Sequence, residues 1–166
     1  RMHDVRLSRE WPSGDGADAP GAGSPTPDVM TSHLTLRLIP DTLAVCRLEP
    51  DAAMPWWATV APFFSVTRTA DELSIICASS RVPRGTDASY DWRALKLPGQ
   101  FHHGLTGILE SISAPLAHAE VSMLVVATFD THYVLIRESQ LPEATAALHA
   151  AGHRVLREQR GAPVGP

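Results

Sequence analysis

The sequence predicts an α+β protein in which helices cover one face of an antiparallel sheet. Three observations support this fold class. Apolar and polar residues alternate over strand lengths from Leu34 onward, and two helical patterns follow in the second half. Residues 91–157 run in the order strand, helix, strand, strand, helix, strand. That βαββαβ order is typical of the ferredoxin-like sandwich.

The first half shows a weakened copy of the same order. The runs LTLRLI and TLAVCRL predict two strands with a turn between them at Pro40 and Asp41. Residues 51–58 predict one or two helical turns interrupted by Pro55. The runs FFSVTRT and ELSIICAS predict two further strands, and no second helix is evident. An internal duplication with a degraded first member is therefore expected.

The second half has clearer elements. WRALKL, VSMLVVATF, HYVLIRE and HRVLRE predict strands, and LPEATAALHAAG predicts a helix that begins with a proline and ends at Gly152. A further helix is expected from Gly104 to about Ala119, with Pro115 kinking it. One face of that helix carries its apolar residues: Leu105, Ile108, Leu109, Ile112 and Leu116.

These patterns divide the chain. The first 30 residues are rich in Gly, Pro and Ala and cannot bury enough surface to offset their ordering entropy, so a disordered tail is expected there, with Met30 as a candidate start. The remaining boundaries are a first module at 34–80, a linker at 81–90, a second module at 91–157 and a flexible C-terminus at 158–166.

Composition argues against several function classes. A net charge of -4 with scattered Lys and Arg gives no basic surface for nucleic acid. No run reaches the roughly 18–20 apolar residues that span a bilayer, and the N-terminus lacks a signal-peptide core. We therefore expect a cytoplasmic protein without nucleic-acid or membrane partners.

Catalytic and metal motifs are also missing from the sequence. There is no GxSxG, GxxxxGK[ST], GxGxxG or HExxH element, so neither a catalytic residue nor a cofactor nor a metal site is predicted. Cys46 and Cys77 lie in apolar strand-like runs and are interpreted as buried thiols, which would form a disulfide only if their strands were neighbours.

The most polar interruption of the second half predicts a ligand site. Residues 128–132 stand between two apolar strands, about twenty residues after the helix start at Gly107. The first N–H groups of a helix lack intrahelical partners, so the backbone of Gly107 and Ile108 is suited to a carboxylate. Acceptors for an ammonium group and an aromatic wall would come from the 128–132 segment: Thr128, Phe129, Asp130, Thr131 and His132.

A plainer interpretation stands beside this one. Thr and Asp are common turn residues, so the hydroxyls of Thr128 and Thr131 are also explained as completing a turn between strands. Gly104 and Gly107 are likewise typical of a loop before a helix. The two interpretations do not exclude each other.

Four segments, taken in order, carry a family resemblance over about residues 34–157: DTLAVCRLEPDAAMPWWA, FFSVTRTADELSIIC, GLTGILESISAPLAHAEVSM and ATFDTHYVLI. Together they resemble the tandem ACT-domain proteins related to the cytosolic arginine sensors of the TOR pathway. The resemblance implies two ACT modules, binding of an amino acid or similar metabolite, pairing of modules and no catalysis. Those sensors carry an acidic residue at the position of His132, and this difference argues against arginine as the ligand.

The function predicted from the sequence is a non-enzymatic, cytoplasmic regulatory or sensor module that binds an amino acid and forms a homodimer. The alternative is a module of the same fold that has lost its ligand and binds a partner protein. A third hypothesis, a small enzyme with His132 as a base, requires an acid that orients the imidazole.

Overall fold

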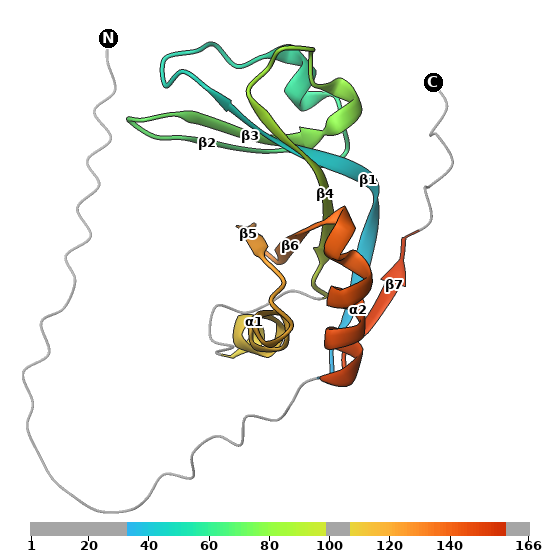
Figure 1. The fold of residues 1–166 in the computed structure, drawn as a ribbon. Helices are drawn as coiled ribbons and strands as arrows, with labels where there is room; N and C mark the ends of the chain where they lie inside the picture. The colour runs from blue at the N-terminus through green and yellow to red at the C-terminus, as the bar shows by residue number, and fades with distance from the viewer. Residues whose placement is uncertain (1–32, 99–106, 159–166) are drawn as a thin grey trace, which may run out of the picture.

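The computed structural model describes residues 33–98 and 107–158. Seven strands in these ranges form one sheet in the order β2-β3-β1-β4-β6-β5, with β7 beside β1 (Figure 1). The strands are β1 (Thr35–Leu48), β2 (Ser65–Arg68), β3 (Leu73–Ala78), β4 (Ala88–Lys96), β5 (Met123–Ala127), β6 (His132–Arg137) and β7 (Arg154–Arg157); the helices are α1 (Ile108–His118) and α2 (Leu141–Ala150), with 3-10 turns η1 (Trp56–Thr59), η2 (Ser79–Arg81) and η3 (Glu138–Gln140).

The predicted fold class is confirmed. Every strand pair is antiparallel except β1 with β7. Both helices pack against one apolar cluster that also includes residues of β1, β4 and β6, so they cover the same face of the sheet (Figure 1). We call this part the lower half, and the part formed by β2, β3, η1 and η2 the upper half.

The predicted turn at Pro40 and Asp41 is wrong, because β1 is a single strand of 14 residues that runs through both positions. Residues 39–41 lie between the pairs Leu38↔Leu95 and Thr42↔Arg93, where β4 has only one intervening residue. They therefore form a β-bulge. A proline has no N–H to give to a ladder, and a bulge is one of the few places in a sheet that tolerates it.

This continuous strand joins the two halves. Residues 35–38 of β1 pair with β7, whereas residues 43–48 pair with β3, and β4 runs beside both parts. In Figure 1, β1 and β4 run together from the upper half into the lower half. In a simple βαββαβ unit β7 would pair with β4, but here β1 lies between them. The order of elements predicts which strands form, not which strand is inserted between two others.

The expected linker at 81–90 ends inside β4, which begins at Ala88. Ala88 and Ser89 pair with Cys46 and Val45 of β1, so the partner strand keeps them extended. The sequence there shows no alternation, because the pairing of β1 with β4 has a second bulge, this one in β4 at Asp91, whose φ is 62°. The expected tail at 1–30 and nearly all of the expected C-terminus at 158–166 lie outside the described residues.

Helix α1 differs from its prediction at its start and on its face. It begins at Ile108, and residues 104–106 lie outside the described part. Ile112 and Leu116 are fully buried as predicted, but Leu109 is 37% exposed. Helix α2 ends as predicted, because Gly152 adopts a φ of +87° after its last turn.

Pro115 lies inside α1, where its missing N–H leaves the carbonyl of Ser111 without its helical donor. The buried imidazole of His153 takes that place, with Nε2 2.9 Å from the Ser111 carbonyl oxygen. Its Nδ1 accepts a hydrogen bond from the Leu34 N–H at 3.2 Å. His153 therefore satisfies one backbone group of α1 and one next to β1, and both ring nitrogens have a structural role.

Candidate functional site

The predicted polar segment forms a tight turn between β5 and β6. The Thr128 N–H donates to the Thr131 carbonyl at 2.8 Å, and the Thr131 N–H donates to the Thr128 hydroxyl at 3.1 Å. The Thr128 hydroxyl also donates to the Thr131 carbonyl at 2.9 Å. The proton of this hydroxyl is thus used within the turn, and a remaining lone pair leaves the oxygen able to accept a bond from a ligand.

The turn is attached to the end of β4. The buried Thr131 hydroxyl donates to the Leu97 carbonyl at 2.8 Å, and the Leu97 N–H donates to the His132 carbonyl at 2.9 Å. From Leu97 the chain leads through residues 99–106, which are outside the described part, to the start of α1. The turn therefore lies beside the strand end from which the helix is reached.

Gly107 occupies the N-cap of α1 with a φ of 89°, in the left-handed region that favours glycine. Its carbonyl accepts the first helical bond, from the Ser111 N–H at 2.9 Å. A glycine has no side chain with which to cap the first N–H groups of the helix. The side chain of Ile108 packs against the core cluster of the lower half, which includes Leu97.

The remaining predicted residues differ in accessibility. Phe129 is 84% exposed and Asp130 is exposed, so both lie at the surface of the turn. His132 is half-buried as the first residue of β6. Within the described residues, the structure therefore joins Thr128, Thr131 and His132 to the end of β4, while Phe129 does not wall a closed cavity.

Comparison with known proteins identifies the fold family. A model of the ACT domain matches residues 87–150, and a model of an N-terminal domain matches residues 41–85. The cytosolic arginine sensor for mTORC1 subunit 1 of Rattus norvegicus is 39% identical over 61 residues, which are 37% of this chain and 18% of the sensor. CASTOR3P of Homo sapiens is 31% identical over 105 residues, 54% of this chain and 63% of that protein. The chain thus spans less than two thirds of either relative.

One solved structure matches over nearly its whole length. Protein Atu0741 from Agrobacterium tumefaciens superposes with a TM-score of 0.73 at 34% identity, covering 77% of this chain and 96% of that one. The chain belongs to the ACT-domain family. The predicted relationship to the arginine sensors is confirmed at the level of sequence similarity. In this ACT-domain protein the ACT match begins one residue before β4, within the segment that had been predicted to be a linker.

The two cysteines are free and fully buried, as interpreted from the sequence. Their strands are neighbours, but Cys46 faces Ile75 and Cys77 faces Ala44, so the thiols are diagonal across the ladder. The hydrogen bond between the two thiols, in which Cys46 donates to Cys77, raises the pKa of Cys46 together with burial, and the same bond lowers the pKa of Cys77. Because both thiols are enclosed in the core of the upper half, they are poorly placed as nucleophiles.

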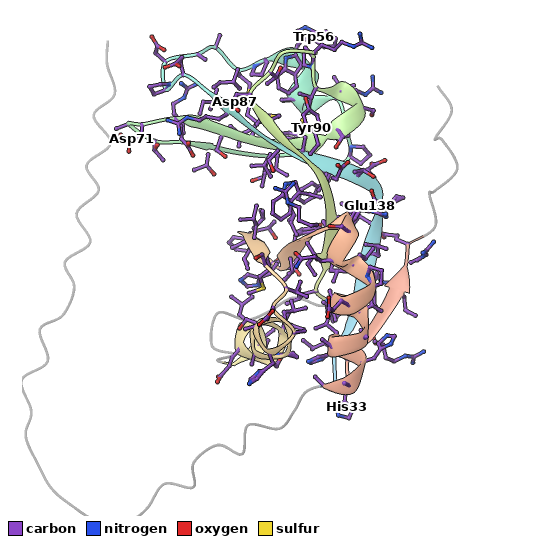
Figure 2. All side chains as sticks on the ribbon, in the orientation of Figure 1. His33, Trp56, Asp71, Asp87, Tyr90 and Glu138 are labelled. Carbon is purple, nitrogen blue, oxygen red and sulfur yellow. The ribbon has the colours of Figure 1, made fainter. Side chains whose placement is uncertain are left out.

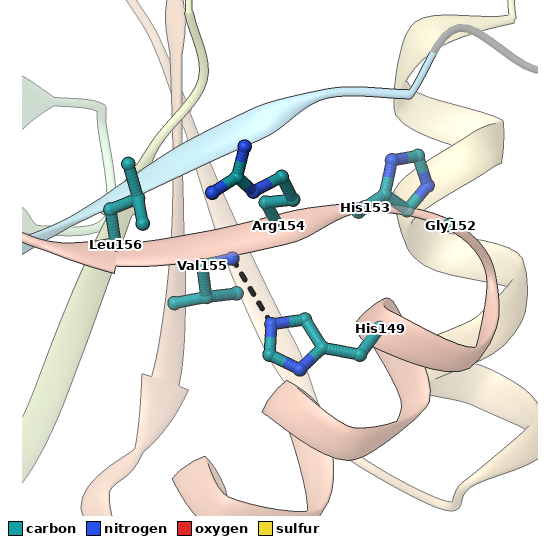
Figure 3. Close-up of a pocket in the computed structure, with 6 residues that line it drawn as sticks. All are labelled: His149, Gly152, His153, Arg154, Val155 and Leu156. Atoms are coloured by element: carbon teal, nitrogen blue, oxygen red, sulfur yellow. Dashed lines mark hydrogen bonds between the residues drawn. The ribbon is translucent and has the colours of Figure 1, made fainter.

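Two cavities lie away from the predicted site. One, of about 470 Å³, lies between the end of α2 and β7, and His149 and His153 are among the residues that line it (Figure 3). These histidines are four residues apart, but His149 Nε2 accepts the Val155 N–H at 3.3 Å and His153 is held by backbone groups. In the part of the chain that the structure describes, no group of three or more metal-ligating side chains gathers.

The second cavity, of about 430 Å³, is bordered by Asp91, Arg137, Glu138 and Ser139. No sequence pattern selects these residues, because Asp91 and Arg137 are 46 positions apart and are brought together by the pairing of β4 with β6. None of the helices in residues 33–98 and 107–158 is long and apolar enough to cross a bilayer.

Proposed function

We propose that this ACT-domain protein is a non-enzymatic regulatory or sensor module that binds an amino acid or similar small metabolite. The observation that carries this proposal is Gly107, a glycine with positive φ that opens the 11-residue helix α1 without capping its first N–H groups. Such a helix start attracts anions through unpaired N–H groups and the helix dipole. The relatives named as arginine sensors support a ligand of the amino-acid class.

In the proposed complex the ligand carboxylate binds the first N–H groups of α1. Its ammonium group lies toward the exposed Asp130 carboxylate and the remaining acceptor capacity of the Thr128 hydroxyl. The exposed ring of Phe129 covers the ligand. This assignment uses Thr131 to fix the turn through Leu97 and leaves Ile108 in the core.

We infer that the preferred ligand is not arginine. At the site's β6 end this chain has His132, and an imidazole does not replace a carboxylate as the partner of a guanidinium. An amino acid with an uncharged side chain matches this position better. Screening all twenty amino acids, with arginine included as a direct comparison, therefore tests the class and the side chain together.

Calorimetric titration of the full chain with each of the twenty amino acids tests the proposal. We expect heat of binding and a rise in Tm for at least one with an uncharged side chain, because a ligand that binds the native state stabilises it. If none of the twenty produces heat or a change in Tm, the amino-acid assignment fails. If arginine binds most tightly, the inference drawn from His132 fails.

The substitution Gly107→Asp tests the location of the site. It places a carboxylate where the ligand's own carboxylate would bind, so we expect affinity for the best amino acid to fall at least about tenfold. Gly85→Asp is the matched control, because Gly85 has a similar φ of +86° and an added Cβ there meets open space. If the Gly107→Asp and Gly85→Asp proteins bound the best amino acid with equal affinity, the site would not lie at the start of α1.

We further propose that the chain forms a homodimer through the free edge of β5. This strand reads MLVVA, with no charge, and within residues 33–98 and 107–158 it pairs only with β6, so its other side is an edge of the described sheet. The opposite edge is protected, because His149 covers the outward N–H of Val155 and β7 carries Arg154 and Arg157. An uncharged apolar edge beside a protected one favours antiparallel pairing of two β5 strands about a two-fold axis.

The second candidate function is a module that binds a partner protein without a small ligand. Both hydroxyl protons of the turn are used in backbone hydrogen bonds, which is what a purely structural turn requires. The apolar β5 edge would then serve a different chain. Absence of amino-acid binding together with a monomeric wild-type protein would favour this function, and a cytoplasmic location suits either candidate.

A further inference from the structure

We propose that the cavity at the junction of the two halves is a second ligand site, which takes the zwitterionic head of a free amino acid. It lies at the opposite end of β6 from the 128–132 turn, about 17 Å away at ~3.3 Å per residue. Figure 2 labels Tyr90 and Glu138, which lie on the two sides of this junction. The proposal does not depend on the Gly107 site.

Arg137 provides the anion-binding group. Its guanidinium lies over the ring of Trp92, with the central carbon 4.2 Å from the ring centroid, and one of its NH₂ groups donates to the Tyr90 carbonyl at 2.6 Å. Trp92 is itself buried, and its indole N–H donates to Ser89 at 2.9 Å. The guanidinium is therefore held in one orientation before any ligand arrives, which lowers the entropic cost of binding.

Among the residues that the structure describes, this guanidinium has no carboxylate partner. The two ion pairs within the described residues are Arg47–Glu72 and Arg93–Glu138. Arg137 borders the cavity beside two acids without pairing with either. Because guanidinium groups bind carboxylates by two parallel hydrogen bonds, the remaining donors of Arg137 are suited to a ligand carboxylate.

Asp91 and Glu138 provide the cation-binding groups. The bulge in β4 holds Asp91 at the border of the cavity, next in sequence to the Tyr90 carbonyl that anchors Arg137. The Arg93–Glu138 contact joins one carboxylate oxygen of Glu138, at 3.0 Å, and leaves the other available. These acids complement an ammonium group placed next to the bound carboxylate.

The charges select among small ligands. One guanidinium and two acids at the rim would repel a phosphate dianion and would leave Arg137 unsatisfied by a simple cation. A group carrying both charges satisfies all three side chains. Asp91, Glu138 and Ser139 are exposed, so the cavity is open to solvent and the side chain of a bound amino acid can extend outward.

The test follows the indole N–H of Trp92 by NMR while the full chain is titrated with glycine, acetate or methylammonium. Glycine is expected to shift this resonance in a saturable manner, acetate to shift it with at least about tenfold weaker affinity, and methylammonium not at all. Equal affinities for acetate and glycine would overturn the zwitterion assignment. No shift with glycine would overturn the site.

Two variants locate the response. Arg137→Lys keeps the positive charge but loses the planar pair of N–H donors that matches a carboxylate. Asp91→Asn keeps a residue that tolerates positive φ but removes the negative charge. Each is expected to weaken glycine binding at least about tenfold, with unchanged spectral dispersion, whereas Arg157→Lys on the exposed end of β7 is the matched control. Wild-type affinity in both cavity variants would overturn the proposal. Shifts at Gly107 and Thr128 report the other site separately.

Discussion

At the scale of single residues, His153 compensates for the proline inside α1. Pro115 cannot donate to the Ser111 carbonyl, and the His153 imidazole supplies a donor while also accepting the Leu34 N–H. A buried backbone group without a partner costs about 1–3 kcal/mol. The proline and the histidine are therefore energetically coupled although they are 38 positions apart in sequence.

A double-mutant cycle measures this coupling. His153→Ala should lower the free energy of unfolding by about 3–5 kcal/mol, because two buried backbone groups lose their partners and a cavity opens. In a Pro115→Ala background the loss should be smaller by about 1–2 kcal/mol, because residue 115 then donates to Ser111. Urea unfolding of the four proteins gives the values, and additivity within about 0.5 kcal/mol would contradict the coupling.

The two helices end in similar turns but with different residues at the left-handed position. After α2 it is Gly152, and after α1 it is Glu120, with a φ of 55°. We expect Glu120→Gly to stabilise the protein by about 0.5–1 kcal/mol, because a side chain at positive φ costs about 1–2 kcal/mol and the freedom of glycine offsets part of the gain. Thermal unfolding is the measurement.

The opposite substitution is the control for this pair. Gly152→Ala should destabilise the protein by about 1 kcal/mol, because an alanine is strained at a φ of +87°, while the exposed His33 side chain, 2.8 Å from the added Cβ, can move aside. If both substitutions shifted Tm in the same direction, backbone conformation would not be the cause.

At the scale of elements, the two outer strands of the lower half differ in how their edges are protected. The β5 edge is apolar and uncharged, whereas the β7 edge has arginines and a histidine over one N–H (Figure 3). The sequence MLVVA predicts a strand equally well for the centre or the edge of a sheet. Only the strand order of the sheet places β5 at an edge. An unprotected edge strand exposes backbone N–H and C=O groups that can pair with another chain.

A lysine in the middle of β5 tests this pairing. Val125 is exposed, so Val125→Lys should leave the fold intact but place two ammonium groups in the proposed dimer contact. Light scattering should report a dimer for the wild-type protein and a monomer for the variant. Leu156→Lys on β7, also an exposed apolar position, is the matched control and should remain dimeric. A dimeric Val125→Lys protein would exclude this surface.

At the scale of the whole molecule, β1 makes the two halves a single folding unit. Its first residues lie between β4 and β7 in the lower half, and Leu34, Leu36 and Leu38 belong to the core under the helices. Its later residues pair with β3 in the upper half. The segment matched by the ACT-domain model, residues 87–150, therefore lacks a strand on which the lower half depends.

A fragment of residues 87–166 should consequently be unfolded. It retains both helices and four strands, but it loses the strand between β4 and β7 and three leucines of the core, about 1.5–3 kcal/mol each when fully buried. The amide dispersion of its NMR spectrum measures the fold, and addition of a peptide of residues 33–48 should restore it. A fragment that folds alone would show that the halves are independent.

Sequence patterns predicted the elements well where each has its own signal. The β3 alternation, the proline start and glycine end of α2, and the polar turn after β5 all correspond to structure. The failures lie where tertiary context overrides a local signal. Pro40 is typical of a turn, but β1 continues through it as a bulge beside β4. Residues 88–90 lack alternation, although pairing with β1 keeps this segment extended. For the candidate site, the turn and the role of Gly107 at the helix start could be predicted, although the helix begins at Ile108 and not at Gly104, whereas Asp91 and Arg137 could not.

The sequence by itself determined the α+β class, the helical and strand segments of the second half and the polar turn, because hydrophobic period and turn chemistry are local properties. Tertiary structure alone decided that β1 passes between β4 and β7, that His153 serves Ser111, and that Arg137 lies over Trp92 at a cavity. These contacts join residues tens of positions apart. Strand pairing sets them, and no local pattern encodes which strands pair.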